Sequence, residues 1–338
     1  MFVAGSSSFT GSPKMEPENR FMHGKNVLIT GSTSGIGLHA AKHFYSLGAS
    51  VIITYREAER GKKAVETVVE SAVAMEGQSV MMLELDLCSF ISVDNFCTEV
   101  KNALKSLDVL VCNAGVMGRP FELTTNGVES HFAANQLGHF ILVRQLIELI
   151  EKAENGRIIV VSSGYYKQAT VMRTRKELMG ESIWDYTPTI AYANSKLANC
   201  LFVRDLERRL TERGSPVKVF CVRPGFIKGT DLGRETSWFL RTIATPVIWA
   251  FASNLDQGIS GIVHCATSDF DELISGKLYY QDQMEECTDT VTAENGLRLW
   301  RMCERMETLI AERSHGKIAT PRVIQWPKFD DRNVKNES

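Results

Sequence analysis

Short apolar runs alternate with amphipathic segments over most of the first 225 residues. The apolar runs have the length of β-strands and occupy residues 26–31, 50–56, 79–87, 108–115, 157–163 and 217–225. Segments with helical spacing separate them, at residues 38–48, 57–76, 127–151 and 191–210. Strands that alternate with helices predict a parallel sheet buried on both faces. The predicted fold class is α/β, a single doubly wound parallel sheet of Rossmann type with helices on both faces.

The ends of the chain differ from this alternating region. The first residues, MFVAGSSSFTGSPKMEPENR, are small and polar and lack the apolar core of a signal peptide or a membrane anchor. No stretch typical of a linker interrupts the region that follows. We therefore expect a flexible extension over 1–22, one domain over 23–315 and a polar tail over 316–338. A cytoplasmic location follows from the same reading of the first residues.

Composition narrows the possible function classes. The 338 residues are 44% hydrophobic and 23% charged, with a net charge of −2, which is ordinary for a globular protein. This charge gives no bias toward nucleic acid, so no nucleic-acid partner is expected. The eight cysteines include no C-x-x-C spacing and read as reduced thiols, so no metal site is expected.

The glycine-rich stretch TGSTSGIG (30–37) lies between the first strand and the first helix. A pyrophosphate bound at a helix N-terminus must approach bare backbone, where free N–H groups and the helix dipole favour negative charge. Side chains at Gly31, Gly35 and Gly37 would obstruct that approach. This turn predicts a dinucleotide site, although a tight turn without a ligand has the same composition.

Tyr192 and Lys196 lie four residues apart in AYANSK, at the start of a predicted helix. The i, i+4 spacing puts both on one helix face. A nearby ammonium favours the phenolate, so this pair could move a proton to or from a substrate oxygen. Taken alone, a pair with this spacing is more often two ordinary surface residues than a catalytic device.

Further motifs follow the glycine-rich turn in a fixed order. They are Asp86 in LDL, CNAG (112–115), Asn135 in FAANQLGHF, Ser163 in VVSS, the Tyr192–Lys196 pair and RPG (223–225). Together they resemble the short-chain dehydrogenase/reductase family, with Cys112 where that family usually has Asn. The resemblance covers residues 25 to 310 and implies a nicotinamide cofactor.

The resemblance also implies roles for individual residues. The implied catalytic residues are Asn135, Ser163, Tyr192 and Lys196. The implied cofactor-binding residues are Gly31, Ser32, Ser34, Gly35, Ile36, Gly37, Arg56, Asp86, Leu87, Asn113, Ala114, Gly115, Tyr192, Lys196, Pro224 and Gly225. In the family, the catalytic asparagine links the lysine to solvent through a water. Ser162 is the alternative to Ser163, and His131 and His139, which flank Asn135, are expected to be structural.

The second strand ends in ITYR, so Arg56 stands where NAD-preferring relatives carry an acidic residue. A guanidinium can bind a phosphate through paired hydrogen bonds. The expected cofactor is therefore NADP(H), with Arg56 on its 2′-phosphate. Arg60 and Lys62 could share this contact, but we expect them on the exposed face of the next helix.

The stretches SKLANCLFVRDLERRL and ENGLRLWRMCERM resemble the branch that holds retinol dehydrogenases and the WW-domain oxidoreductase. The family resemblance implies a substrate lid over about 228–256, and within it residues 238–252 form the most hydrophobic stretch. An apolar lid predicts a hydrophobic small-molecule substrate, such as a retinoid, steroid, lipid aldehyde or aromatic ketone. The same stretch could make a peripheral contact with an intracellular membrane, and a homodimer is compatible with the family.

Two functions remain open from the sequence. The first is an NADP(H)-dependent oxidoreductase that transfers hydride between nicotinamide and a hydrophobic alcohol or carbonyl, with Tyr192 as proton donor or acceptor. The alternative is a nucleotide-binding regulatory or interaction protein on the same fold with little turnover.

Overall fold

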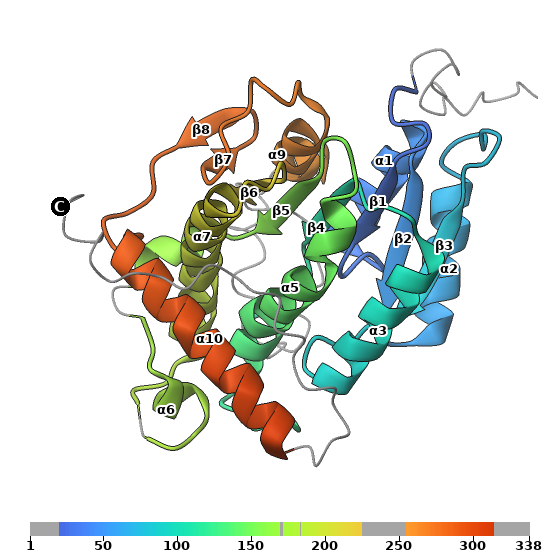
Figure 1. Cartoon of the computed structure of the whole chain (residues 1–338). Helices are drawn as coiled ribbons and strands as arrows, with labels where there is room; N and C mark the ends of the chain where they lie inside the picture. The colour runs from blue at the N-terminus through green and yellow to red at the C-terminus, as the bar shows by residue number, and fades with distance from the viewer. Residues whose placement is uncertain (1–19, 170–171, 183, 225–254, 314–338) are drawn as a thin grey trace, which may run out of the picture.

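A computed structural model describes residues 20–169, 172–182, 184–224 and 255–313 (Figure 1). The described strands are β1 (Asn26–Ile29), β2 (Ser50–Tyr55), β3 (Val80–Glu84), β4 (Val109–Cys112), β5 (Arg157–Val161), β6 (Lys218–Val222), β7 (Leu278–Tyr280) and β8 (Gln283–Glu285). They form one sheet in the order β3-β2-β1-β4-β5-β6-β7-β8. All neighbours are parallel except β7 and β8, which pair antiparallel. The order reverses between β1 and β4, where open α/β sheets bind ligands at the carboxyl ends of their strands.

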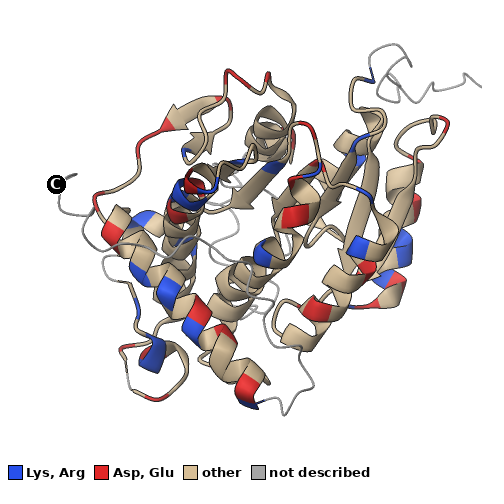
Figure 2. Cartoon of the chain, in the orientation of Figure 1, with Lys and Arg blue, Asp and Glu red and all other residues tan. Residues whose placement is uncertain are grey.

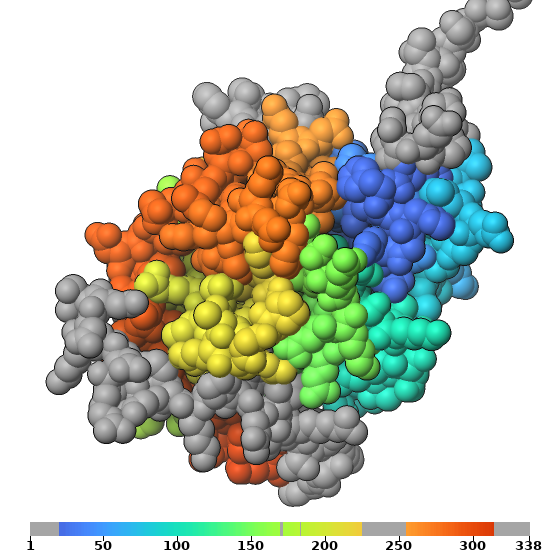
Figure 3. All heavy atoms as spheres, turned by 45° about the horizontal axis from the view of Figure 1, so that its top comes forward, coloured from blue at the N-terminus to red at the C-terminus, as the bar shows by residue number. Residues whose placement is uncertain are grey.

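Helices cover both faces of this sheet. The longer described helices are α1 (Gly35–Ser46), α2 (Ala58–Val69), α3 (Phe90–Ala103), α5 (Gly138–Ile150), α7 (Pro188–Glu212), α9 (Leu255–Thr267) and α10 (Ala293–Arg313). Shorter turns are α4 (Ser130–Phe132), η2 (Ala133–Leu137), η3 (Gly164–Gln168) and α6 (Arg175–Leu178). One apolar core joins the sheet to α3, α5, α7 and α10, and a second joins it to α1, α2 and α9. In Figure 3 the orange atoms of the α9 region accordingly border the blue atoms of the N-terminal region.

Successive side chains of each buried strand belong alternately to the two apolar cores. On β1, Leu28 belongs to the first core, whereas Val27 and Ile29 belong to the second. Successive side chains of a strand point to opposite faces, so a strand covered on both sides is apolar at every position. The continuous apolar runs in the sequence follow from this two-sided burial. The predicted doubly wound fold is confirmed.

The last described helix, α10, lies across α7 and α5 (Figure 1). Trp300 is 1% exposed and packs edge-to-face on Phe140 of α5, with ring centroids 4.9 Å apart. It also stacks on Phe202 of α7 at 6.0 Å. Figure 2 shows Lys and Arg interleaved with Asp and Glu along α10.

Several elements differ from the expectation. The helix α3, the helix α9 and the strands β7 and β8 were not predicted, and α2 ends at Val69 rather than at residue 76. Arg20 and Met22 are buried, so packing reaches into the segment expected to be an extension. Residues 1–19, 225–254 and 314–338, which include most of the expected lid and all of 238–252, lie outside the described residues. Within the described part of the chain, no helix is both long and apolar enough to cross a bilayer.

Candidate active site

The glycine-rich turn joins β1 to α1 through backbone that few side chains permit. Gly31 and Gly35 have φ of +67° and +56°, in the left-handed region that favours glycine. A Cβ on Gly31 would lie 2.8 Å from Ala114 Cα. The N-cap residue Ser34 makes no side-chain hydrogen bond to the first turn of α1, which also contains no acidic residue. The first turn is thus suited to an anionic ligand.

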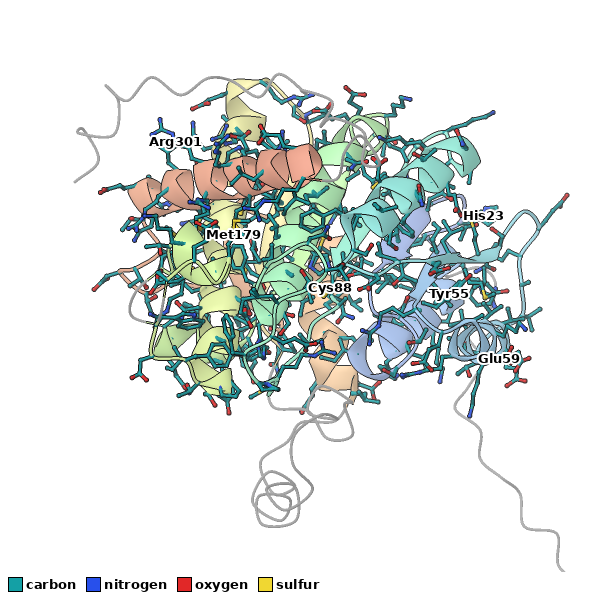
Figure 4. The ribbon with its side chains drawn as sticks, turned by 90° about the horizontal axis from the view of Figure 1, so that it is seen from below. His23, Tyr55, Glu59, Cys88, Met179 and Arg301 are labelled. Carbon is teal, nitrogen blue, oxygen red and sulfur yellow. The ribbon has the colours of Figure 1, made fainter. Side chains whose placement is uncertain are left out.

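A cavity of about 340 Å³ opens at this turn and extends along the carboxyl ends of β1 to β5. Tyr55 at the end of β2 and Cys88 after β3 both line the cavity, and Figure 4 labels both, with Glu59 farther out on α2. The predicted cofactor-binding residues that line it are Gly31, Ser34, Gly35, Ile36, Gly37, Arg56, Asp86, Leu87, Asn113, Ala114, Gly115, Tyr192, Lys196 and Pro224. The structure therefore brings together residues that are spread over more than 190 positions of the sequence.

Ser32 and Gly225 complete the predicted cofactor set but are not among the residues that line the cavity. The Ser32 hydroxyl is buried, donates to Ile29 O at 2.7 Å and accepts from Thr54 N at 2.9 Å. Its side chain therefore holds β1 to β2 rather than pointing at a ligand. Gly225 lies outside the described residues.

Helix α7 places Tyr192 and Lys196 on one face, as the spacing predicts. Thr187 caps this helix by accepting from Ile190 N at 3.2 Å, and Pro188 occupies the first turn. Ser163, at the end of β5, hydrogen-bonds the Tyr192 phenol through its side chain. The Ser162 hydroxyl instead donates to Lys196 O at 2.8 Å. The strand alternation therefore directs Ser163, and not Ser162, to the phenol.

The environment of the pair differs from the expected one. Burial raises the pKa of Tyr192 to about 12, while the Ser163 hydrogen bond lowers it and the nearby Tyr165 phenol raises it further. Burial also lowers the pKa of Lys196 to about 8. The Lys196 ammonium donates to Val161 O at 2.8 Å and lies 5.8 Å from the Tyr192 ring centroid. Desolvation of the phenol, rather than the ammonium, thus dominates its pKa.

Asn135 lies in the π-helical turn η2 between α4 and α5, and it is 1% exposed. Its Oδ1 accepts from Val116 N at 2.8 Å, and its Nδ2 donates to Val116 O at 3.0 Å and to Ser195 Oγ at 2.8 Å. A Cβ on Gly115 would lie 3.3 Å from Asn135 Oδ1 and 3.6 Å from Lys196 Nζ. Asn135 and Lys196 therefore flank the same glycine of the β4 loop. Single-turn π-helices are frequent at functional sites.

Two arginines besides Arg56 line the cavity: Arg60, which the sequence gives as a possible second contact to the phosphate, and Arg119, which it does not indicate. Arg60 lines the cavity, so its expected place on the exposed face of α2 was wrong. Lys62 is on that exposed face, where it pairs with Glu59 at 2.7 Å. Arg119, which follows the CNAG loop by four residues, also lines the cavity. The first turn of α2 carries Arg60 close to the end of β2, and this proximity was the available signal.

Comparison with known proteins agrees with this geometry. A family model described as short chain dehydrogenase matches residues 25–174. The WW domain-containing oxidoreductase of Gallus gallus is 34% identical over 296 residues, which cover 86% of this chain and 69% of that protein. Retinol dehydrogenase 14 of Homo sapiens is 35% identical over 303 residues, which cover 86% of this chain and 88% of that protein.

Solved structures show the same fold. A protein from Mycobacterium paratuberculosis is 27% identical with a TM-score of 0.62, over 84% of this chain and 94% of that one. A short-chain type dehydrogenase/reductase from Mycobacterium marinum has a TM-score of 0.59 at 19% identity, over 77% and 95% of the two chains. The resemblance to the branch of retinol dehydrogenases and the WW-domain oxidoreductase is confirmed. The chain belongs to the short-chain dehydrogenase/reductase family of nicotinamide-dependent oxidoreductases.

Proposed function

We propose that this protein is an NADP(H)-dependent oxidoreductase that interconverts a hydrophobic alcohol and its carbonyl, with Tyr192 as proton donor or acceptor. One observation supports it most strongly. A single cavity is lined by the glycine-rich turn and Arg56 and also by Tyr192 and Lys196. A dinucleotide long enough to occupy such a cavity would present its phosphates to the turn and its nicotinamide to the phenol.

The glycine-rich turn packs so closely on the protein that it leaves no room for a side chain at Gly37, and the uncapped first turn of α1 that follows it suits a pyrophosphate. A Cβ on Gly37 would contact Gly31 O and lie 2.6 Å from Asn113 Nδ2. The neighbouring wall carries the guanidinium groups of Arg56, Arg60 and Arg119. Bidentate guanidinium contacts favour a 2′-phosphate, and this supports NADP(H) over NAD(H).

Tyr192, at the other end of the cavity, and the neighbouring Ser163 would handle the proton and the substrate oxygen. When bound, NADPH would supply the hydride in carbonyl reduction and NADP⁺ would accept it in alcohol oxidation. The high pKa of Tyr192 keeps the phenol protonated at neutral pH, which suits a proton donor in carbonyl reduction. Ser163, which already bonds the phenol, can also donate to the substrate oxygen. Lys196 lies beside the cavity and would hold the nicotinamide ribose.

The substrate class rests on relatives and on composition. Retinol dehydrogenase 14 and the WW domain-containing oxidoreductase are similar over most of this chain. The hydrophobic stretch 238–252 adds to this argument from its sequence alone. We therefore expect a retinoid, a steroid, a lipid aldehyde or an aromatic ketone. This choice is tested by incubating the protein with NADPH and substrates of these four classes and measuring the loss of NADPH absorbance.

The cofactor is tested by changing Arg56. Loss of one charged hydrogen bond costs about 1.5–3 kcal/mol, or roughly ten- to a hundredfold in affinity. Arg56→Ala should therefore weaken NADPH binding by that factor and leave NADH binding unchanged. Lys62→Ala is the matched control, because Lys62 is exposed and pairs with Glu59 away from the cavity. An equal loss for both cofactors, or a wild-type preference for NADH, would contradict the assignment.

Turnover is tested by Tyr192→Phe on any substrate that the screen identifies. The variant should bind NADPH as the wild type does and lose about 10²–10⁴ in rate, the usual contribution of general acid–base catalysis. Full activity of the Phe variant would refute the role of the phenol. Tight NADPH binding without turnover of any of the four substrate classes would favour the regulatory alternative.

A further inference from the structure

Thr30 is the first residue of the glycine-rich stretch, and its hydroxyl has several hydrogen-bond partners. Its Oγ1 accepts from Asn113 N at 2.9 Å and from Ala114 N at 3.0 Å. A hydroxyl has two acceptor sites and one hydrogen, so that hydrogen must be donated elsewhere. The nearer acceptor is His139 Nε2 at 2.8 Å, while Val111 O lies at 3.4 Å.

These contacts of Thr30 favour one tautomer of His139. Because Nε2 accepts from Thr30, the proton of the neutral ring is on Nδ1. Nδ1 lies 3.3 Å from Asn135 O, and no other hydrogen-bond partner of Nδ1 occurs among the described residues. The ring is 1% exposed, and burial lowers the pKa of His139 to about 3, so it stays neutral at physiological pH. The imidazole thus links the Thr30 hydroxyl, which donates to it, to the Asn135 carbonyl, which accepts from it.

The Asn135 carbonyl is thereby held by two side chains. It accepts from His139 Nδ1 and also from Asn199 Nδ2 at 2.9 Å. The amide side chain of Asn135 is held separately, by Val116 and Ser195. Both the main chain and the side chain of this π-helical residue are thus fixed beside Lys196.

We propose that His139 is a positioning residue that couples the cofactor-binding loops to the catalytic asparagine. On one side it holds Thr30, which in turn orders Asn113 and Ala114 in the wall of the cavity. On the other side it orients the Asn135 carbonyl within η2. His139 does not line the cavity itself. The sequence alone predicts a structural role for His139. The part of this inference that concerns turnover rests on the proposed function.

Two substitutions separate the two bonds. In His139→Gln the longer side chain can place an acceptor near the position of Nε2, which retains the bond from Thr30 and loses the donor to Asn135. In His139→Asn the shorter side chain can place a donor near the position of Nδ1, which retains the bond to Asn135 and loses the acceptor for Thr30. The Gln variant should keep NADPH affinity and lose turnover, and the Asn variant should lose NADPH affinity and keep kcat. Each loss should be about three- to tenfold, the usual range for one hydrogen bond.

Thr30 provides a second set of variants that leaves the histidine intact. Thr30→Ser keeps the hydroxyl and should bind NADPH like the wild type, whereas Thr30→Val should bind it more weakly. Adding His139→Asn to Thr30→Val should cause no further loss, because the bond is already absent. These binding measurements need no substrate, so they test the coupling even if the proposed oxidoreductase activity is wrong.

The results that would overturn the proposal are specific. If His139→Gln and His139→Asn lower thermal stability, NADPH affinity and kcat in parallel, His139 is only a core residue. If His139→Asn binds NADPH like the wild type, or if the losses in the double variant multiply, Thr30 and His139 are not coupled.

Discussion

Gly37→Ala tests the glycine-rich turn with a single added methyl group. The new Cβ would contact Gly31 O and would lie 2.6 Å from Asn113 Nδ2. Comfortable contacts begin near about 3.5 Å, so the methyl is roughly 0.9 Å too close to the amide. To relieve this contact, Asn113 would have to give up its 2.9 Å hydrogen bond to Thr30 O.

The expected stability change is the difference between two effects. Overpacking costs about 1–3 kcal/mol, and replacing glycine by alanine within a helix returns at most about 1 kcal/mol. Because one of the opposing atoms is a backbone oxygen that cannot rotate away, we expect a net loss of about 1–2 kcal/mol, or roughly 2–6 °C in Tm. NADPH affinity should fall at least about tenfold, since relief of the clash must shift Gly31 or Asn113, which both line the proposed cofactor cavity.

Thermal unfolding and fluorescence titration with NADPH measure the two effects. Gly164→Ala is the matched control, because a Cβ there would meet no heavy atom within 4 Å. The control should leave both Tm and NADPH affinity unchanged. If Gly37→Ala bound NADPH as tightly as the wild type, the turn would not be the phosphate site.

Three further predictions concern buried polar groups. Ser32→Ala should lower the free energy of unfolding by about 1–3 kcal/mol, since it removes the acceptor of Thr54 N. NADPH affinity, corrected for the fraction of unfolded protein, should stay unchanged. A loss of affinity without a loss of stability would show that Ser32 contacts the ligand. Lys196→Met should remove a pH dependence of stability, because the pKa of Lys196 in the folded protein is lowered from 10.5 to about 8. The free energy of unfolding of the wild type, relative to that of the variant, should rise between pH 8 and 10.5 by up to about 3 kcal/mol. Denaturation curves of the two proteins that stay parallel across that pH range would contradict the lowered pKa. Glu307→Ala should cost about 3 kcal/mol, because it leaves the buried Arg144 charge with only its longer ion pair to Glu304, at 3.8 Å. The double change Arg144→Met with Glu307→Leu should cost far less. Equal losses in chemical denaturation would show that Arg144 and Glu307 are not coupled.

The sequence predicted the strands of the sheet that are buried on both faces, because continuous apolar runs reflect that burial directly. The helix α3 was missed although Phe90, Val93, Phe96, Cys97 and Val100 follow helical spacing. The helical spacing of α3 is therefore visible in the sequence alone. The strands β7 and β8 have three residues each, which is too short for any period to be visible. They form because β6 offers an edge, which is a tertiary property.

The candidate site divides in the same way. Motif order predicted which residues converge on the cavity, since each follows the carboxyl end of a strand or begins a helix. The orientation of single side chains was harder, as Ser32 and Arg60 illustrate: one points into the core and the other into the cavity. The pKa of Tyr192 could not be predicted, because it depends on burial by elements that are distant in sequence.

The position of α10 at the end of the described chain also bears on biosynthesis. All four predicted catalytic residues precede residue 200. The helix α10, which covers α5 and α7, contributes Trp300 and Glu307 to this contact, and Glu307 follows its partner Arg144 by 163 residues. A nascent chain emerges from its N-terminus, so Phe140 and Phe202 remain uncovered until this last helix is synthesised. A chain that stopped before residue 293 would contain every predicted catalytic residue and still expose an aromatic surface. Such a product would be a substrate for chaperones and proteases rather than a smaller enzyme.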